Sequence, residues 1–396
     1  MDYIRSLCRR ATFLLLVVLC AAGVSAGAVA GGEAPDSERE QAAALGIANA
    51  QAALDAGDVV AAGALLIQVV NAYPDTEARF DGYPVLEEAL KRLSSGRLPF
   101  EVLSEFEANL PSVKDLTSAE ARHILHAFFL SRATLLDTMG MPDLAQSQLQ
   151  SAGESVLETL GAYPGEAWHV GAVPAVFEAA VTCAPEYAHV YAEALETFVA
   201  RSRPSMAAFC ARSALVGYYL HEGMDRKVAE KHMTVLLNAA SSALIAEALL
   251  DPFLRDTEKA CLLWAKGYAA YEMGQHQTAL GVFQQIAAEL PDAGREKAWA
   301  ELTIPAAYRK LYPADPSLAE AAYRDYLSTH EGHECAQWAL LELGNIALED
   351  GRLDEAASYF SRIETEFPAG DAVPMASSGL KKVIELKALE RESGAD

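Results

Sequence analysis

Apolar positions recur along most of the chain with the three- and four-residue spacing of amphipathic helices, and the alternation typical of strands is nearly absent. Ala, Leu, Glu, Gln and Arg, which favour helices, fill the long stretches between breaks. The segment from Ala260 to Leu290 is representative, because Gly274 interrupts its helical pattern where one helix would end and the chain reverse. The sequence therefore predicts an all-α protein built from helix pairs.

This interrupted pattern recurs at fixed spacing. Gly274 is followed by Ala279, Phe283 and Pro291, and the same offsets join three further sets: Gly351, Ala356, Phe360 and Pro368; Gly57, Ala62, Leu66 and Pro74; and, without the proline, Gly140, Ala145 and Leu149. Glycine ends the first helix, alanine lets the two helices approach, the large residue fills the adjoining gap, and proline closes the second helix. Because one hairpin cannot bury its own apolar face, the copies must stack.

The repeated positions resemble the tetratricopeptide repeat (TPR), a helix–turn–helix unit of about 34 residues. The best copy runs from Gln337 to about Asp371, and weaker copies begin at Ala260, Ala43 and His126. A fifth, irregular copy lies one period before the best one, with Ser317 in place of its turn glycine. The resemblance implies a right-handed superhelical solenoid of helix hairpins with an irregular middle segment.

Five segments follow from these patterns along the chain. They are a signal peptide (1–30), a polar leader (31–40), N-terminal TPR-like repeats (41–160), an irregular helical linker (161–206), and a C-terminal TPR array (207–396). Several prolines and glycines set the linker apart. The array ends in an amphipathic helix near Val373 to Glu392, which suits a cap on the open end of a stack.

The first thirty residues carry the features of a secretory signal. Arg5, Arg9 and Arg10 precede an apolar run, and small residues follow before possible cleavage after Ala26 or Ala30. The alternative is an uncleaved anchor, because residues 11–30 carry no charge and are about long enough to span a membrane. The pattern predicts export, with the mature protein in the periplasm or outside the cell and associated with the cell envelope.

The amino-acid composition and net charge exclude some classes of binding partner. The 396 residues are 52% hydrophobic, which excludes a wholly disordered chain. The formal net charge of −24 argues against sequence-independent nucleic-acid binding and against direct binding to an anionic membrane surface. Four cysteines follow the predicted signal, namely Cys183, Cys210, Cys261 and Cys335. They could pair in three ways or remain as buried free thiols.

Candidate chemistry is sparse. Residues 330–335 (HEGHEC) form the densest cluster of possible metal ligands, but they lack the HExxH spacing, so a solvated loop between repeats is predicted there. His123 and His126 lie one helical turn apart and are expected to pack at the edge of the core. The sequence contains no GxSxG, P-loop or strand-associated GxGxxG motif. It therefore predicts no catalytic residue, metal or cofactor.

The tetratricopeptide resemblance implies that the first helix of each pair lines a concave groove. Its fifth, ninth, twelfth and thirteenth positions would contact a ligand. In the copies from Ala260 and Gln337, these residues are Trp264, Tyr268, Tyr271, Glu272, Leu341, Asn345, Leu348 and Glu349. The three aromatic residues share one helical face, where they would anchor an apolar or aromatic segment of a partner. The alternative is that they pack against neighbouring helices.

The resemblance implies a non-enzymatic scaffold that binds a protein or peptide partner in this groove, as part of an envelope assembly or secretion complex. One alternative is an accessory subunit that handles a cell-envelope glycan or peptide. Another is a hydrolase that uses acidic residues on the helical scaffold to act on such a substrate.

Overall fold

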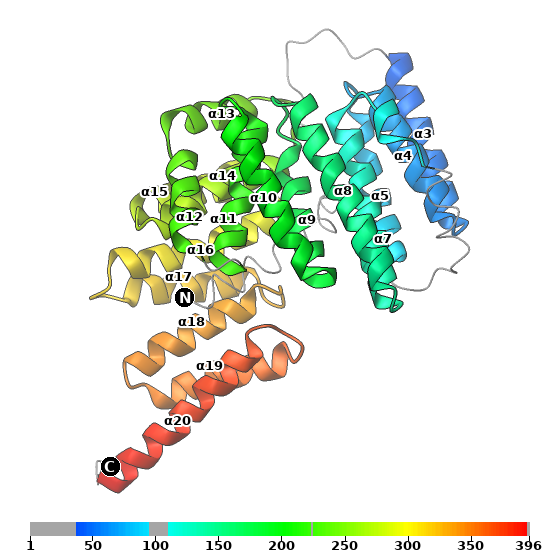
Figure 1. The fold of residues 1–396 in the computed structure, drawn as a ribbon. Helices are drawn as coiled ribbons and strands as arrows, with labels where there is room; N and C mark the ends of the chain where they lie inside the picture. Colours follow the sequence, from blue (N-terminus) through cyan, green and yellow to red (C-terminus); the bar gives the residue numbers. More distant parts are fainter. Residues whose placement is uncertain (1–36, 95–109, 223–224, 394–396) are drawn as a thin grey trace. The chain divides into compact units, whose positions relative to one another are not determined.

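The computed structural model describes residues 37–94, 110–222 and 225–393. Within these ranges every regular element is a helix, which confirms the all-α prediction (Figure 1). Internal contacts divide the described residues into an N-terminal unit (37–265 with Asp292–Gly294) and a C-terminal unit (266–291 with 295–393). The predicted signal peptide and residues 31–36 of the leader lie outside the described residues.

The N-terminal unit is a succession of helices, most of them joined by short turns. In chain order they are α3 (Ser37–Asp55), α4 (Val59–Ala72), η1 (Ala78–Asp81), α5 (Gly82–Ser94), η2 (Val113–Asp115), α7 (Ala119–Thr138), α8 (Pro142–Ala162), α9 (His169–Cys183), α10 (Pro185–Arg201), α11 (Met206–His221), α12 (Arg226–Leu236), α13 (Ala239–Leu249) and the first part of α14 (Asp256–Glu272). The predicted linker contains α9 and α10, and the domain boundaries drawn from the sequence stay predictions.

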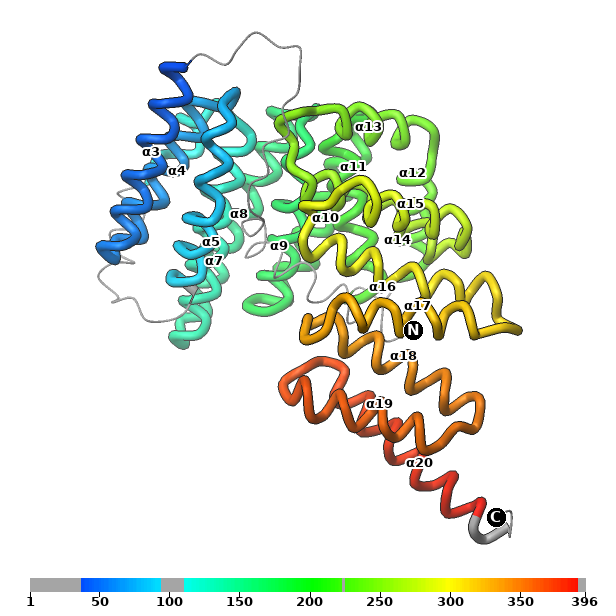
Figure 2. The backbone as a smooth tube through the Cα atoms, turned by 180° about the vertical axis from the view of Figure 1, so that it is seen from behind, coloured from blue at the N-terminus to red at the C-terminus, as the bar shows by residue number. Residues whose placement is uncertain are grey.

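The C-terminal unit continues as hairpins and a final helix. Figure 2 shows this part of the chain running back and forth. It contains the second part of α14, then α15 (His276–Glu289), α16 (Gly294–Leu311), α17 (Ser317–Thr329), α18 (Ala336–Glu349), α19 (Leu353–Glu366) and α20 (Val373–Ser393). Helix α19 packs against both α18 and α20, so the last helix lies against the final hairpin, and its role as a cap stays a prediction.

Glycine makes the four predicted turns. Gly57, Gly140, Gly274 and Gly351 have φ values of 86°, 75°, 75° and 75°, a left-handed conformation that other residues adopt only at a cost. Each glycine lies between the end of one helix and the start of the next. The spacing read from the sequence therefore identifies real helix reversals.

A second kind of glycine lets helices approach closely. A Cβ built on Gly344 of α18 would lie 2.4 Å from Cε1 of Phe360, and one on Gly379 of α20 would lie 2.6 Å from Cε2 of the same ring. The fully buried ring of Phe360 is thus held between two glycines. In the N-terminal unit Gly63 has the same relation to Phe128, with the nearest ring atom 2.5 Å away.

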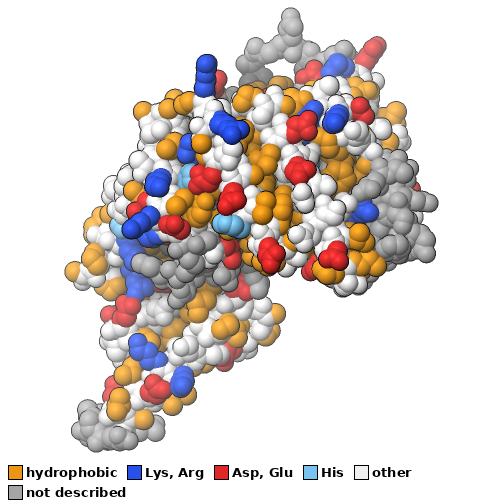
Figure 3. Space-filling model, viewed as in Figure 1, with side chains coloured by type: hydrophobic (Ala, Val, Ile, Leu, Met, Phe, Trp, Pro, Cys, Tyr) orange, Lys and Arg blue, Asp and Glu red, His pale blue; other side chains and the backbone are white. Residues whose placement is uncertain are grey.

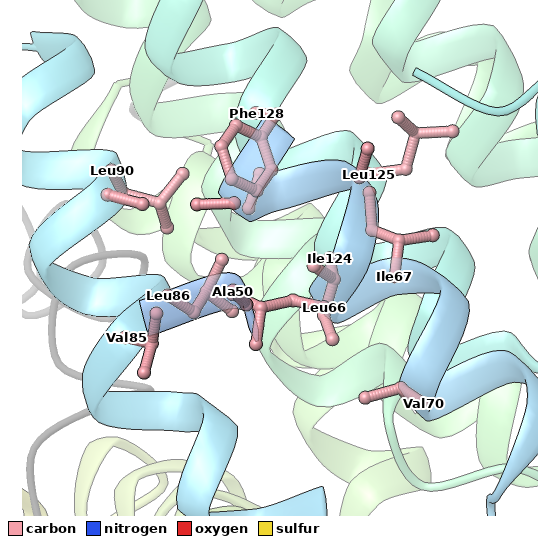
Figure 4. Close-up of a cluster of buried hydrophobic side chains, with 14 of the residues drawn as sticks. Ala50, Leu66, Ile67, Val70, Val85, Leu86, Leu90, Ile124, Leu125 and Phe128 are labelled. Carbon is pink, nitrogen blue, oxygen red and sulfur yellow. The ribbon is translucent and has the colours of Figure 1, made fainter. Parts of the chain in front are cut away.

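The N-terminal core forms where α3, α4, α5 and α7 meet. Leu66, Ile67, Leu90, Leu125 and Phe128 are among its buried side chains (Figure 4). Removing such side chains from water is the main stabilising contribution, roughly 2 kcal/mol for each large one. On the face seen in Figure 3, charged side chains of both signs are interspersed with hydrophobic ones over this unit.

The described cysteines are free thiols, in agreement with the second alternative. Cys210, Cys261 and Cys335 are buried and Cys183 is half-buried. Burial raises the pKa of the Cys183 thiol to about 11 and raises the pKa values of Cys210 and Cys335 as well. These thiols behave as small apolar side chains rather than as nucleophiles.

Within the described ranges, no single helix is both long and apolar enough to cross a membrane. The bent pair α12 and α13 meets the length and composition criteria only when its two helices, which differ in direction by 60°, are taken together.

Candidate functional site

The eight predicted groove residues differ in exposure. Tyr268, Tyr271 and Leu341 are buried, with 7%, 8% and 3% of their surface exposed. Trp264, Glu272, Asn345 and Leu348 are half-buried, and Glu349 is exposed. Trp264 belongs to the N-terminal unit and the other seven to the C-terminal unit. Their assignment to a partner stays a prediction, but the exposed part of the set is more polar than the sequence suggested.

Tyr271 lies near the end of α14 with its ring edge against His276, at a centroid distance of 5.2 Å. Burial raises the pKa of the Tyr271 phenol, and the carboxylates of Glu342 and Glu272 raise it further. The hydroxyl therefore stays protonated and can donate a hydrogen bond. The Tyr271 phenol is thus close enough to α18 of the same unit for the charge of Glu342 to affect it.

Arg309 of α16 bridges two carboxylates of α18. One guanidinium nitrogen lies 2.5 Å from Oε2 of Glu342, and the other lies 2.5 Å from Oε1 of Glu349. The Arg309 and Glu342 side chains are 25% and 14% exposed, whereas that of Glu349 is 65% exposed. Burial acts to lower the pKa of Arg309, but the two carboxylates outweigh it and raise that pKa. Burial also raises the pKa of Glu342, and Arg309 opposes this.

Tyr323 of α17 completes this cluster. Its side chain is fully buried, and its hydroxyl has no hydrogen-bond partner among the described residues. Burial, followed by the charge of Glu342 and the neighbouring Tyr271, raises the pKa of the Tyr323 phenol well above its usual value. Arg309, Glu342 and Tyr323, which with Tyr271 and Glu349 we call the Arg309 cluster, were not found by sequence reasoning. The available signal was the separation of Arg309 and Glu342 by 33 residues, about one repeat.

The HEGHEC loop is less solvated than expected. Cys335 is fully buried, and the ring of His330 stacks on Tyr326 with its centroid 4.2 Å away. His330 Nε2 also lies 3.0 Å from a carboxylate oxygen of Glu301 on α16. These contacts tie successive hairpins of the C-terminal unit together. Across the part of the chain that the structure describes, no three His, Cys, Asp or Glu side chains converge as metal ligands would.

Comparison with known proteins identifies the repeats. The family model for the tetratricopeptide repeat matches residues 262–293 and 338–369, which are the hairpins α14–α15 and α18–α19. No curated protein matches the chain. Among solved structures, a Rap protein complexed with Competence and Sporulation Factor is similar at 15% identity and a TM-score of 0.37, covering 89% of this chain and 99% of that one. A likeness of this size assigns no function. The chain therefore contains two hairpins that match the tetratricopeptide repeat.

Proposed function

We propose that the chain is a non-enzymatic scaffold that binds a segment of a partner protein on the first helices of its C-terminal repeats. The observation that carries this proposal is the Arg309 cluster, which lies on α14, α16, α17 and α18 in and between the two matched hairpins. Repeats of this kind expose an extended surface formed by several successive units. The protein acts in an exported compartment, as the residues before 31 suggest.

The charge of the cluster favours a basic partner segment. Glu342 and Glu349 supply two carboxylates to the guanidinium of Arg309, and Glu342 also acts on Tyr271. A Lys or Arg side chain of a partner would offset this excess, while Leu348 of the same unit offers a half-buried apolar contact. We therefore propose a ligand segment that combines a basic residue with an apolar or aromatic one.

A display selection of peptides on the purified full chain tests the proposal. We expect enrichment of peptides with a basic residue next to an aromatic or branched one, and about tenfold weaker binding to the Glu349→Lys variant. The matched control is Asp325→Lys, which reverses an exposed charge on α17, a second helix. Selected peptides that bind wild type and Glu349→Lys equally well, or an absence of enrichment, would contradict the proposal.

A further inference from the structure

Two adjacent tyrosines of α11 form a partly exposed aromatic surface in the N-terminal unit, outside the two matched hairpins. The ring centroids of Tyr218 and Tyr219 lie 5.3 Å apart, and the ring planes meet at 66°. Both side chains pack against the apolar core of this unit, yet both stay half-buried. Helix α11 packs against α9, α10 and α12 (Figure 1), so the surroundings of the two rings come from these helices.

Each of the two rings has an aromatic neighbour stacked on it. The ring of Phe177 on α9 lies 4.9 Å from that of Tyr218, with the planes at 17°. The ring of His232 on α12 is parallel to that of Tyr219 within 3°, at a centroid distance of 6.2 Å. Phe177 and His232 are both buried. These neighbours hold the tyrosine rings in place, so the exposed part of each ring is preorganised for contact.

Helix α10 places carboxylates beside both rings. His189, Glu193 and Glu196 share one face of this helix, because they are spaced by four and three residues. His189 Nδ1 lies 3.5 Å from the Tyr218 hydroxyl, and its Nε2 lies 3.4 Å from a carboxylate oxygen of Glu193. Glu196 acts on Tyr219 through its charge and a hydrogen bond. One face of α10 thus follows the tyrosine pair with acidic side chains.

Carboxylates dominate the charge at the two phenols. Burial raises the pKa of Tyr218, and it raises the pKa of Tyr219 to about 12. Nearby negative charges raise both pKa values further, those of Glu193 and Glu222 at Tyr218 and those of Glu196 and Asp225 at Tyr219. Both phenols therefore stay neutral at pH 7, and the surrounding charge favours a cation at their rings.

Two cations nearby balance this charge only in part. Arg212 of α11 donates to His232 Nδ1 over 3.2 Å and to the carbonyl oxygen of Val199 over 3.2 Å. Because Nδ1 accepts, the His232 ring is neutral and carries its proton on Nε2, which donates to Glu196 over 2.8 Å. Lys231, whose charge also acts on His232, is the second cation. With the histidine rings uncharged, four carboxylates face two cations.

We propose that this surface binds an arginine side chain of a partner protein segment. We call it the tyrosine surface and define it by Glu193, Glu196, Tyr218, Tyr219 and Glu222. A guanidinium group stacks on aromatic rings and donates two parallel hydrogen bonds to a carboxylate. The two rings supply the first contact, and Glu193, whose side chain is 70% exposed, supplies the second. An acidic segment would be repelled, and a purely apolar one would cover the carboxylates without pairing them. The tyrosine surface lies wholly in the N-terminal unit, so it does not depend on the function proposed for the C-terminal repeats.

Three peptides of equal length test the requirement for a guanidinium group. They alternate glycine with arginine, lysine or citrulline, the uncharged isostere of arginine, and have blocked ends. We expect saturable binding of the arginine peptide to the full chain in surface plasmon resonance, and binding of the citrulline peptide at least about tenfold weaker. The lysine peptide should bind about threefold more weakly, because an ammonium group lacks the planar shape that stacks on a ring. Equal or tighter binding of the lysine or citrulline peptide, or no saturable binding of the arginine peptide, would overturn the proposal.

Substitutions of the rings separate recognition at this surface from general attraction to an acidic chain. Tyr218→Leu and Tyr219→Leu keep apolar bulk but remove the ring, so each should weaken binding of the arginine peptide about fivefold. Tyr219→Phe removes only the hydroxyl and should bind within about twofold of wild type. Tyr312→Leu, which removes a 47% exposed tyrosine from the C-terminal unit, is the matched control. If folded Tyr218→Leu and Tyr219→Leu variants bind normally, net charge alone attracts the peptide and the proposal fails.

Charge variants complete the test, with circular dichroism and thermal unfolding to verify the fold. Glu193→Gln and Glu196→Gln should each weaken binding of the arginine peptide about threefold, whereas Glu158→Gln, at an exposed position of α8, should not. In the Glu349→Lys background the loss caused by Tyr219→Leu should be unchanged. A loss that disappears in this background would place the arginine peptide on the C-terminal repeats, which would overturn the tyrosine surface and leave the proposed function standing.

Discussion

In the N-terminal unit the Arg255–Glu258 pair is nearly covered, with side chains 19% and 2% exposed, whereas in the C-terminal unit the Arg309–Glu349 pair leaves its carboxylate 65% exposed. The first pair lies inside the unit, where the Arg255 guanidinium also stacks on the Tyr83 ring. The second retains surface through which a partner can reach it. The same residue types thus form a buried pair inside one unit and part of a candidate protein-binding surface in the other, according to burial.

The largest expected difference between the units is in their response to acid. The pKa values of His126 and His169 are about 3 and about 4 in the folded protein, below the ordinary value of 6.5. Between these lowered pKa values and 6.5, the unfolded state binds more protons than the folded state. The free energy of unfolding that the neutral histidines contribute is therefore fully present above pH 6.5 and is lost as the pH falls. The loss for His169 alone is on the order of 3 kcal/mol by pH 4. Hydrogen exchange of α7 and α9 from pH 7.5 to 4.5 measures it.

One neighbouring carboxyl acts in the opposite direction. Burial raises the pKa of Glu120, so its protonation on acidification favours the folded state. The His169→Gln variant separates the two contributions, because it removes one of the two histidines and keeps Glu120. We expect a shallower loss of protection in α7 and α9 for this variant. An equally steep loss would assign the acid sensitivity to other groups.

The next largest effect is expected from breaking the buried ion pair. Glu258→Gln removes the carboxylate partner of Arg255 in a site where Glu258 is only 1% exposed. Leaving a mostly buried guanidinium without its partner is expected to cost about 3 kcal/mol. Urea unfolding followed by hydrogen exchange of α5 and α14 measures the change. A loss below about 1 kcal/mol would show that water compensates Arg255 and that burial does not make this pair stronger than an exposed one.

A smaller loss of stability is expected from glycine-to-alanine substitutions, and it should be the same in both units. In each unit a glycine packs directly against a buried aromatic ring. Gly344→Ala and Gly63→Ala each place a Cβ within 2.4–2.5 Å of a buried ring, of Phe360 or Phe128. Overpacking of this kind costs about 2 kcal/mol. Gly281→Ala on α15 is the matched control, because no atom lies within 4 Å of its new Cβ. It should be neutral or stabilise the helix by up to about 1 kcal/mol. Thermal unfolding of the three variants compares them.

The parts of the molecule that could be predicted from sequence depend on local chemistry. Gly57 and Gly274 identify reversals because few other residues adopt a positive φ there. Arg309, Glu342 and Tyr323 escaped prediction because the fifth, irregular copy, with Ser317 where the turn glycine is expected, gave no register from which to choose the residues that face its neighbours. The contact between His123 Nε2 and His169 Nδ1, which lie 2.8 Å apart, escaped prediction for another reason. His169 is 46 residues from His123, and only the packing of α7 against α9 brings them together.

The candidate groove also shows that the sequence pattern alone does not predict exposure. The spacing of Tyr268 and Tyr271 places them on one face of α14, but it does not say whether neighbouring helices cover that face. Both side chains are at least nine-tenths buried, so packing takes most of the surface that the motif offered to a partner. Periodicity predicts which residues share a helix face, whereas the surroundings of Tyr271 include Arg309 and Glu342, which lie about one and two repeats further along the chain.

The smallest expected effect is on the stability of the exposed pair in the C-terminal unit. Glu349→Gln removes one of the two partners of Arg309 while Glu342 keeps the guanidinium neutralised. The change in the free energy of unfolding should therefore stay below about 1 kcal/mol and disappear in about 1 M salt, where exposed charges are screened. Urea unfolding at low and high salt measures this. A loss near 3 kcal/mol that persists in salt would mean that the Arg309 pair stabilises the fold as strongly as the buried Arg255 pair does, and the contrast between the two units would vanish. A small, salt-sensitive loss leaves Glu349 available to exchange its internal contact with Arg309 for one with a basic partner.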